Sequence, residues 1–114
     1  MSQRGIVTVI APQGFLTGGD ETEAFEKTIK RCLDEGTKHI VIDCAGVKHM
    51  NSVGLGILIV GHSRAVRTGR RFVLARIDKH IESIFVTTKL SIIFDVYPTV
   101  ELGVAALTEP QQAP

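Results

Sequence analysis

Residues 41–58 have the sequence VIDCAGVKHMNSVGLGIL, in which a strand leads through a short polar loop into a helix. Residues 40–42 form an uninterrupted β-branched run, which is typical of a strand covered on both faces of a sheet. Either Asn51 or Ser52 can cap the helix that follows, and Gly69 can end it. A central strand followed directly by a helix indicates an α/β fold.

The elements before this stretch alternate in the same way. A first strand is predicted at residues 6–10 and a short second strand at residues 15–16, and we expect these two to form an antiparallel pair. A helix then begins near Asp20, which we expect to act as its cap with Glu23 as the capping-box partner. Gly36 is predicted to end this helix.

The elements after the stretch continue the alternation. Residues 72–75 are a second buried strand, and residues 80–90 have the apolar spacing of a helix. A short strand at residues 94–97 and a last helix capped by Thr99 complete the series. One face of the helix after residue 51 is expected to point inward, and it comprises Leu55, Leu58, Ile59, His62 and Val66. In the helix of residues 80–90 the inward face comprises Ile81, Ile84, Phe85 and Thr88.

The length of 114 residues is enough for one hydrophobic core and too short for two. We therefore expect a single α/β domain at residues 1–108, with a mixed, mostly parallel sheet of about four to five strands and helices packed on it. Residues 109–114 have almost nothing to bury, which predicts a flexible tail.

Composition favours a soluble protein in the cytoplasm. The formal net charge is +1 and 22% of residues are charged, so there is no bulk attraction to nucleic acid. The N-terminal residues lack the apolar run of a signal peptide, and the longest apolar stretch, residues 55–61, is too short to cross a bilayer. Cys32 and Cys44 are too few for a disulfide framework, so we expect two buried thiols.

No known catalytic or cofactor motif is present. Gly54 and Gly56 are followed by a glycine only at Gly61, so the spacing does not match the dinucleotide-binding motif G-x-G-x-x-G. The phosphate-binding motif G-K-[ST] does not occur. Neither Ser52 nor Ser63 lies in a nucleophile elbow. We therefore expect neither enzymatic activity nor a bound cofactor. We also expect no metal site, because the four histidines are not spaced as metal ligands; they are His39, His49, His62 and His80.

Three segments carry a resemblance to a known family. Residues 43–58 are similar, in order and without gaps, to the pattern D-x-S-G-V-x-x-M-D-S-S-G-L-G-x-L of the sulphate transporter and anti-sigma factor antagonist (STAS) family. The likeness continues through residues 69–74 and through residues 88–97, where T-G-L-x-x-I-F-x-I-Y is matched with Lys89 in place of glycine. The resemblance implies a single STAS-like domain that acts as a regulatory, protein-binding module of the anti-sigma factor antagonist type.

The mechanism that the resemblance implies is partner switching, in which a serine kinase phosphorylates the second serine of D-S-S-G. A phosphate at a helix N-terminus interacts favourably with the helix dipole, yet it adds nearly two negative charges to a contact surface. Here Asn51 replaces the aspartate, Ser52 matches the first serine, and Val53 occupies the phosphoacceptor position. We favour a member that works without phosphorylation; phosphorylation of Ser52 or of another hydroxyl, or a different input, are the alternatives.

The predicted partner-binding segment is the loop and the start of the helix after it, with Met50 and Val53 as apolar contacts on a polar connection. Its residues are Met50, Asn51, Ser52, Val53, Gly54, Leu55 and Gly56. A basic rim is predicted beside it, formed by Lys48, Arg64 and Arg67 with Arg70 and Arg71.

The partner implied by the resemblance is an anti-sigma factor or serine kinase of the kinase-like ATPase type. We expect the chain to be a monomer when free, with no direct nucleic-acid binding and no membrane insertion. The alternative is a soluble STAS accessory subunit docked on the ATPase of a lipid or solute ABC transporter. A nucleotide-binding protein ranks last, because no phosphate-cradling loop is recognisable.

Overall fold

The computed structural model describes residues 2–36 and 39–108, in which strands and helices alternate along the chain. Its main sheet has five strands, and β4 lies at the centre of the order β1-β2-β4-β6-β7. The strand β1 is antiparallel to β2, and the other neighbouring strands are parallel, which confirms the predicted mixed, mostly parallel sheet. The strands are β1 (Ser2–Arg4), β2 (Val7–Ile10), β4 (His39–Asp43), β6 (Phe72–Ala75) and β7 (Val96–Tyr97). The predicted tail, residues 109–114, and the first residue of the predicted domain lie outside the described residues.

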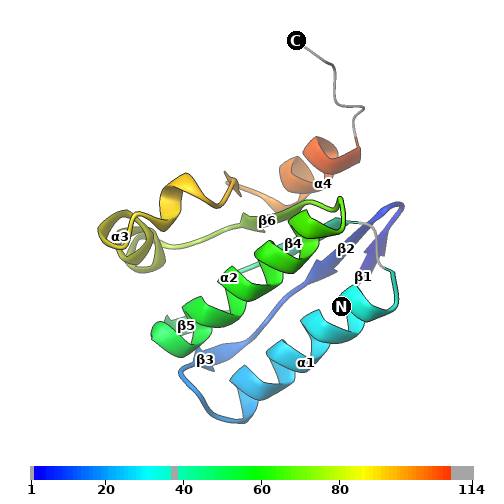
Figure 1. The fold of residues 1–114 in the computed structure, drawn as a ribbon. Helices are drawn as coiled ribbons and strands as arrows, with labels where there is room; N and C mark the ends of the chain where they lie inside the picture. Colours follow the sequence, from blue (N-terminus) through cyan, green and yellow to red (C-terminus); the bar gives the residue numbers. More distant parts are fainter. Residues whose placement is uncertain (1, 37–38, 109–114) are drawn as a thin grey trace.

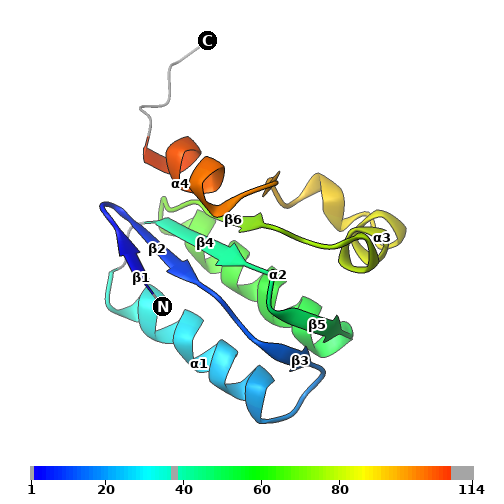
Figure 2. The same ribbon diagram turned by 180° about the vertical axis from the view of Figure 1, so that it is seen from behind.

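Two further strands, β3 (Gly14–Leu16) and β5 (Val47–Met50), form a small parallel sheet of their own. The predicted antiparallel pairing of residues 6–10 with residues 15–16 is therefore wrong. Figure 2 shows the reason: the chain keeps its direction from β2 into β3, just as it does from β4 into β5. A turn that contains proline does not have to reverse the chain, and here β3 pairs with β5 instead of folding back on β2.

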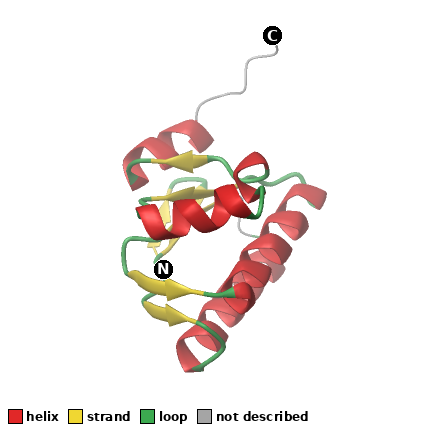
Figure 3. Cartoon of the chain, turned by 90° about the vertical axis from the view of Figure 1, so that its left-hand side faces the viewer, coloured by secondary structure: helices red, strands yellow, loops and turns green. Residues whose placement is uncertain are grey.

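Helices cover both faces of the main sheet (Figures 1 and 3). The helices α1 (Asp20–Asp34), α2 (Ser52–Arg67) and α3 (Lys79–Thr87) pack on one face, where Ile40 and Ile42 point. The helix α4 (Val100–Thr108) packs on the other face, against Val41. Consecutive residues of β4 thus point to opposite cores, which explains the uninterrupted apolar run. A short 3-10 turn, η1 (Leu90–Ile92), connects α3 to β7.

The predicted helices exist, but two of their details differ. The helix α1 has Gly19 as its N-cap and no side-chain cap, so Asp20 lies inside the first turn instead of capping it. The helix α3 ends at Thr87, and the expected inward residue Thr88 is exposed. Thr99 behaves as predicted, because its Oγ1 accepts a hydrogen bond from the backbone N–H of Leu102 at 3.1 Å.

The buried face of α2 is the main difference from the sequence prediction. Ile59 and Val66, both expected inside, are 38% and 55% exposed. The buried face consists instead of Gly54, Leu55, Leu58, Gly61 and Ala65. The small residues on this face allow the helix axis to approach the sheet closely. Ile59 and Val66 lie outside this buried face.

Candidate functional site

The loop between β5 and α2 is fixed by the side chain of Asn51. Its Oδ1 accepts a hydrogen bond from the backbone N–H of Val53 at 2.9 Å, which caps α2, and its Nδ2 donates to the carbonyl oxygen of Thr17 at 3.2 Å. The backbone N–H of Asn51 also donates to the carbonyl oxygen of Leu16, at 3.3 Å. Asn51 therefore both starts the helix and holds it against the end of β3.

Half of the predicted binding segment is exposed. Asn51, Ser52 and Val53 lie on the surface, and the Val53 side chain is 46% exposed at the first turn of α2. Gly56, one turn later, is partly exposed, and a Cβ at this position would meet no atom within 4 Å.

The other residues of the segment, Met50, Gly54 and Leu55, are buried, so they are not part of the exposed surface. Met50 is only 3% exposed and belongs to the main core, although it looked like an apolar residue on a polar connection. Gly54 and Leu55 face the same core. Met50 is the last residue of β5, and its side chain points into this core although the burial of the strand does not alternate: Val47 and Met50 are buried, and Lys48 and His49 are exposed. These residues position the surface but do not form it.

Gly54 sets how closely α2 approaches β3. A Cβ built on Gly54 would lie 2.6 Å from the carbonyl oxygen of Leu16 and 2.8 Å from Cγ of Met50. No real side chain fits at such distances without a shift of the helix. The glycine therefore holds the exposed turn of Ser52 and Val53 at a fixed depth against the small sheet.

The predicted basic rim is not one surface. Lys48 lies on β5, just before α2, whereas Arg64 and Arg67 lie in the last turn of that helix. Arg64 is twelve residues further along α2 than Ser52, a rise of about 18 Å along the helix axis. Arg64 also donates to Asp34 of α1 at 3.0 Å.

The two remaining arginines of the proposed rim have structural partners. Arg70 donates to the carbonyl oxygen of Leu33 at 3.0 Å, and Arg71 donates to that of Ala106 at 3.2 Å. These contacts tie the turn before β6 to α1 and to α4.

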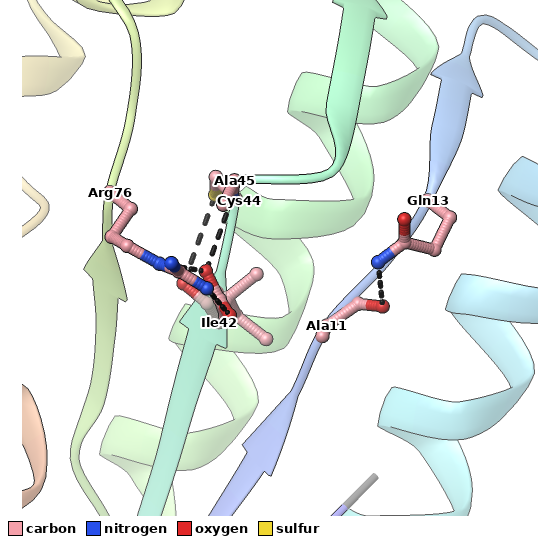
Figure 4. Close-up of polar contacts among 7 residues, drawn as sticks. Ala11, Gln13, Ile42, Cys44, Ala45 and Arg76 are labelled. Atoms are coloured by element: carbon pink, nitrogen blue, oxygen red, sulfur yellow. Dashed lines mark hydrogen bonds and ion pairs between the residues drawn. The ribbon is translucent and has the colours of Figure 1, made fainter. Parts of the chain in front are cut away.

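An ion pair at the carboxyl ends of the central strands was not predicted from the sequence. Nε and Nη2 of Arg76 donate to the two carboxylate oxygens of the buried Asp43, at 2.9 Å and 2.6 Å. The hydrogen bonds from Arg76 are the main reason that the pKa of Asp43 is lowered, and the backbone N–H of Ala45 adds a smaller effect. In Figure 4 the side chain of Arg76 extends from the end of β6 toward the strand end beside Cys44 and Ala45.

Arg76 has a left-handed backbone conformation with φ of 56°, which is uncommon for a residue with a side chain. No sequence motif signals this pairing. It requires knowledge that β4 and β6 are neighbours and that both strands end at the same level.

The histidines have packing roles and do not form a metal cluster. His49 stacks on His80 with ring centroids 5.1 Å apart, and His62 packs edge-on against Phe94. Burial, together with the charge of Arg71, lowers the pKa of His39, whose Nδ1 accepts a hydrogen bond from the backbone N–H of Arg71. Within residues 2–36 and 39–108, no three His, Cys, Asp or Glu residues are grouped as metal ligands, and no helix is long and apolar enough to cross a membrane.

The STAS domain family matches residues 2–103, which is most of the chain. The chain belongs to the STAS domain family. The match includes β1, the whole sheet and the first turn of α4, so this STAS domain comprises the entire described fold except the end of that helix.

Solved structures with the same fold include regulators and a transporter domain. A Thermotoga maritima protein considered an anti-sigma factor antagonist superimposes with a TM-score of 0.87 and 19% identity, covering 95% of this chain and 92% of its own. The Bacillus cell fate determinant SpoIIAA in its phosphorylated form gives 0.74 and 17%, with coverages of 93% and 95%. The STAS domain of a Vibrio cholerae SulP transporter gives 0.73 and 16%, with coverages of 92% and 83%. At these identities the likeness establishes the fold alone.

The surface that this STAS domain presents at the start of α2 is short and well defined. It consists of a capping amide, a hydroxyl and a valine, on Asn51, Ser52 and Val53. The capping bond already occupies the backbone N–H of Val53, so this amide is not available to a bound anion. The arrangement is suited to contact with another protein surface.

Proposed function

We propose that this STAS domain is a non-catalytic regulatory module that binds a protein partner through Asn51, Ser52 and Val53 at the start of α2. The observation that carries the proposal is the exposed Val53 side chain on a turn held rigid by Asn51 and Gly54. A rigid apolar group loses little conformational entropy when a partner covers it. Burial of the exposed part of one valine contributes about 1 kcal/mol, so Val53 acts as one anchor among several.

Binding of this kind does not depend on phosphorylation at position 53. Valine has no hydroxyl, so the position that the family pattern uses for phosphate cannot accept it. Ser52 is exposed and remains a candidate for modification, but its neighbour Asn51 already provides the helix cap without a phosphate. The partner we propose is a kinase-like anti-sigma factor or a related serine kinase, with which the domain acts by partner switching in the cytoplasm.

A second candidate function has its own support. The likeness to the STAS domain of a SulP transporter shows that the fold is also used in transport. In that case the domain is an accessory subunit docked on the ATPase of a lipid or solute transporter. The same exposed turn serves as the docking surface, and only the identity of the partner differs.

The test compares two exposed valines of one helix. Tagged wild-type, Val53→Asp and Val66→Asp proteins are recovered from native cells after mild crosslinking, and copurifying proteins are quantified by mass spectrometry. A negative charge at position 53 is expected to remove the specific partner, whereas Val66→Asp, with the same change near the other end of α2, is expected to keep it. Equal recovery with Val53→Asp and the wild type rejects this surface.

A further inference from the structure

A long groove lies between α1 and α2 on the outside of the domain. The two helices run side by side in the same direction (Figure 1). Gly18 and Val53 line one end of the groove, and Leu33 and Arg64 line the other. Its volume is about 920 Å³, and Gly56 and Gly61 leave its α2 wall without side chains at two positions.

The α2 wall of this groove is apolar where a surface helix is normally polar. Val53, Ile57 and Val60 follow each other at helical spacing of four and three residues, and all three line the groove. Val60 is the most exposed of them, at 59%. This stripe continues along the same side of the helix to Arg64 and Arg67.

The groove carries acidic side chains mainly at one end. Glu23 and Glu26 of α1 lie toward the end with Val53, and Lys30 and Arg64 lie toward the opposite end; Lys27, which also lines the groove, pairs with Glu23 at 3.0 Å. Glu26 is left to favour an occupant with basic side chains at the first end, and such side chains compete with Lys27 for Glu23. The dipoles of α1 and α2 point the same way, so an added helix is favoured when it runs antiparallel to both.

Among the helices in the described part of the chain, α2 itself meets these requirements. It has an exposed apolar stripe, basic residues Arg64 and Arg67 in its last turn, and no acidic residue in its first turn. We propose that the groove binds α2 of a second copy of this chain, antiparallel, in a symmetric dimer with its twofold axis beside Val60. In this arrangement Glu23 of each copy faces Arg67 of the other, and the contact is self-complementary.

The size of the contact predicts a weak dimer. A helix of 16 residues is about 24 Å long and, with its neighbour, roughly 20 Å wide, so each copy buries on the order of 500 Å². The total of about 1,000 Å² for the two copies lies at the lower limit for a specific interface, so we expect a weak dimer. The net charge of +1 gives little repulsion between copies.

The dimer covers Val53 at the edge of the contact. Self-association and binding of the proposed partner therefore exclude each other, which gives the domain an off state that needs no phosphate. This consequence rests on the proposed function, whereas the dimer does not, so the following experiments use the purified chain without any partner.

Sedimentation equilibrium tests the dimer directly. The wild type is expected to change from monomer to dimer between about 5 μM and 1 mM. Val60→Asp places two like charges at the twofold axis and is expected to weaken the dimer by at least about tenfold. Val66→Asp is the matched control and should dimerise like the wild type. Circular dichroism verifies that each variant is folded. The proposal is overturned if the wild type stays monomeric throughout this range, or if Val60→Asp dimerises as strongly as the wild type.

A charge exchange tests the antiparallel arrangement itself. Glu23→Lys and Arg67→Glu are each expected to weaken self-association by about tenfold, because each makes both symmetric contacts repulsive. An equimolar mixture of the two variants is expected to associate like the wild type, since opposite charges then face each other again. Failure of the mixture to recover association contradicts this geometry.

Discussion

Gly54→Ala and Gly56→Ala are predicted to change stability in opposite directions, although the two glycines are two residues apart in α2. The Cβ added at Gly54 would lie 2.6 Å from the carbonyl oxygen of Leu16, 2.8 Å from Cγ of Met50 and 2.9 Å from Cβ of Leu16. The Cβ added at Gly56 would meet nothing within 4 Å. Neither glycine has a positive φ, so backbone strain does not enter the comparison.

The magnitudes follow from two opposing terms. Replacement of glycine by alanine inside a helix stabilises it by about 1 kcal/mol, and this applies at both positions. Overpacking costs about 1–3 kcal/mol, and this applies at Gly54 only, where two of the three close atoms belong to β3. We expect Gly56→Ala to raise the free energy of unfolding by up to about 1 kcal/mol and Gly54→Ala to lower it by up to about 2 kcal/mol.

Urea denaturation and thermal melting, followed by circular dichroism at low protein concentration, measure both variants. The predicted difference of about 1–3 kcal/mol, which is the overpacking cost, corresponds to roughly 4–12 °C between their melting temperatures for a domain of this size. If both substitutions stabilise the protein equally, α2 does not approach β3 as closely as the structure shows, and the account of how Val53 is positioned is wrong.

Three further predictions concern single side chains. Asn51→Ala should lower the free energy of unfolding by about 1 kcal/mol through loss of the helix cap, whereas Asn51→Asp should lose less because a carboxylate also caps; urea denaturation distinguishes them. The pKa of Asp43 is lowered in the folded state, so its ion pair stabilises the fold above about pH 4, and this contribution disappears as the pH falls further. In Asp43→Asn this part of the pH dependence of stability should be absent. Thermal melting of both proteins between about pH 2 and pH 7 measures it. Burial raises the pKa of the Cys44 thiol to about 12, so this thiol should react with a thiol reagent only after unfolding, and rapid labelling of native protein would contradict its burial.

Much of the fold could be predicted because the pattern and the packing agree. The β-branched run at residues 40–42 correctly indicates a central strand, since its side chains alternate between two cores. The start of α2 was predicted to within one residue, because both Asn51 and Ser52 are good caps, and the structure has Asn51 as the N-cap. It was harder to predict which strands pair. Whether residues 15–16 pair with the first strand depends on the path of the chain through residues 11–13, which the local sequence does not determine.

The candidate site was only partly predictable for a similar reason. A valine and a methionine on a polar loop look alike in sequence, yet Val53 is exposed and Met50 is buried. Strand alternation does not predict this burial, because Lys48, two residues before Met50 in β5, is exposed. Helix spacing also predicted that Ile59 lies on the buried face of α2. The buried face includes Gly54 and Gly61, and glycines do not contribute to a hydrophobic pattern in the sequence. The pairing of Arg76 with Asp43 joins residues 33 positions apart and appears only in three dimensions.

The central claim is that Val53 and its neighbours bind a protein partner without phosphorylation. One crosslinking experiment on tagged protein in its native cells tests it most directly, because mass spectrometry identifies the partner, the crosslinked residues and the mass of the peptide with Asn51, Ser52 and Val53. We expect a kinase-like partner crosslinked near the start of α2 and an unmodified peptide. A transporter ATPase at the same place would assign the domain to the accessory-subunit class, and a phosphorylated Ser52 in the bound form, or crosslinks confined to α4, would contradict the claim.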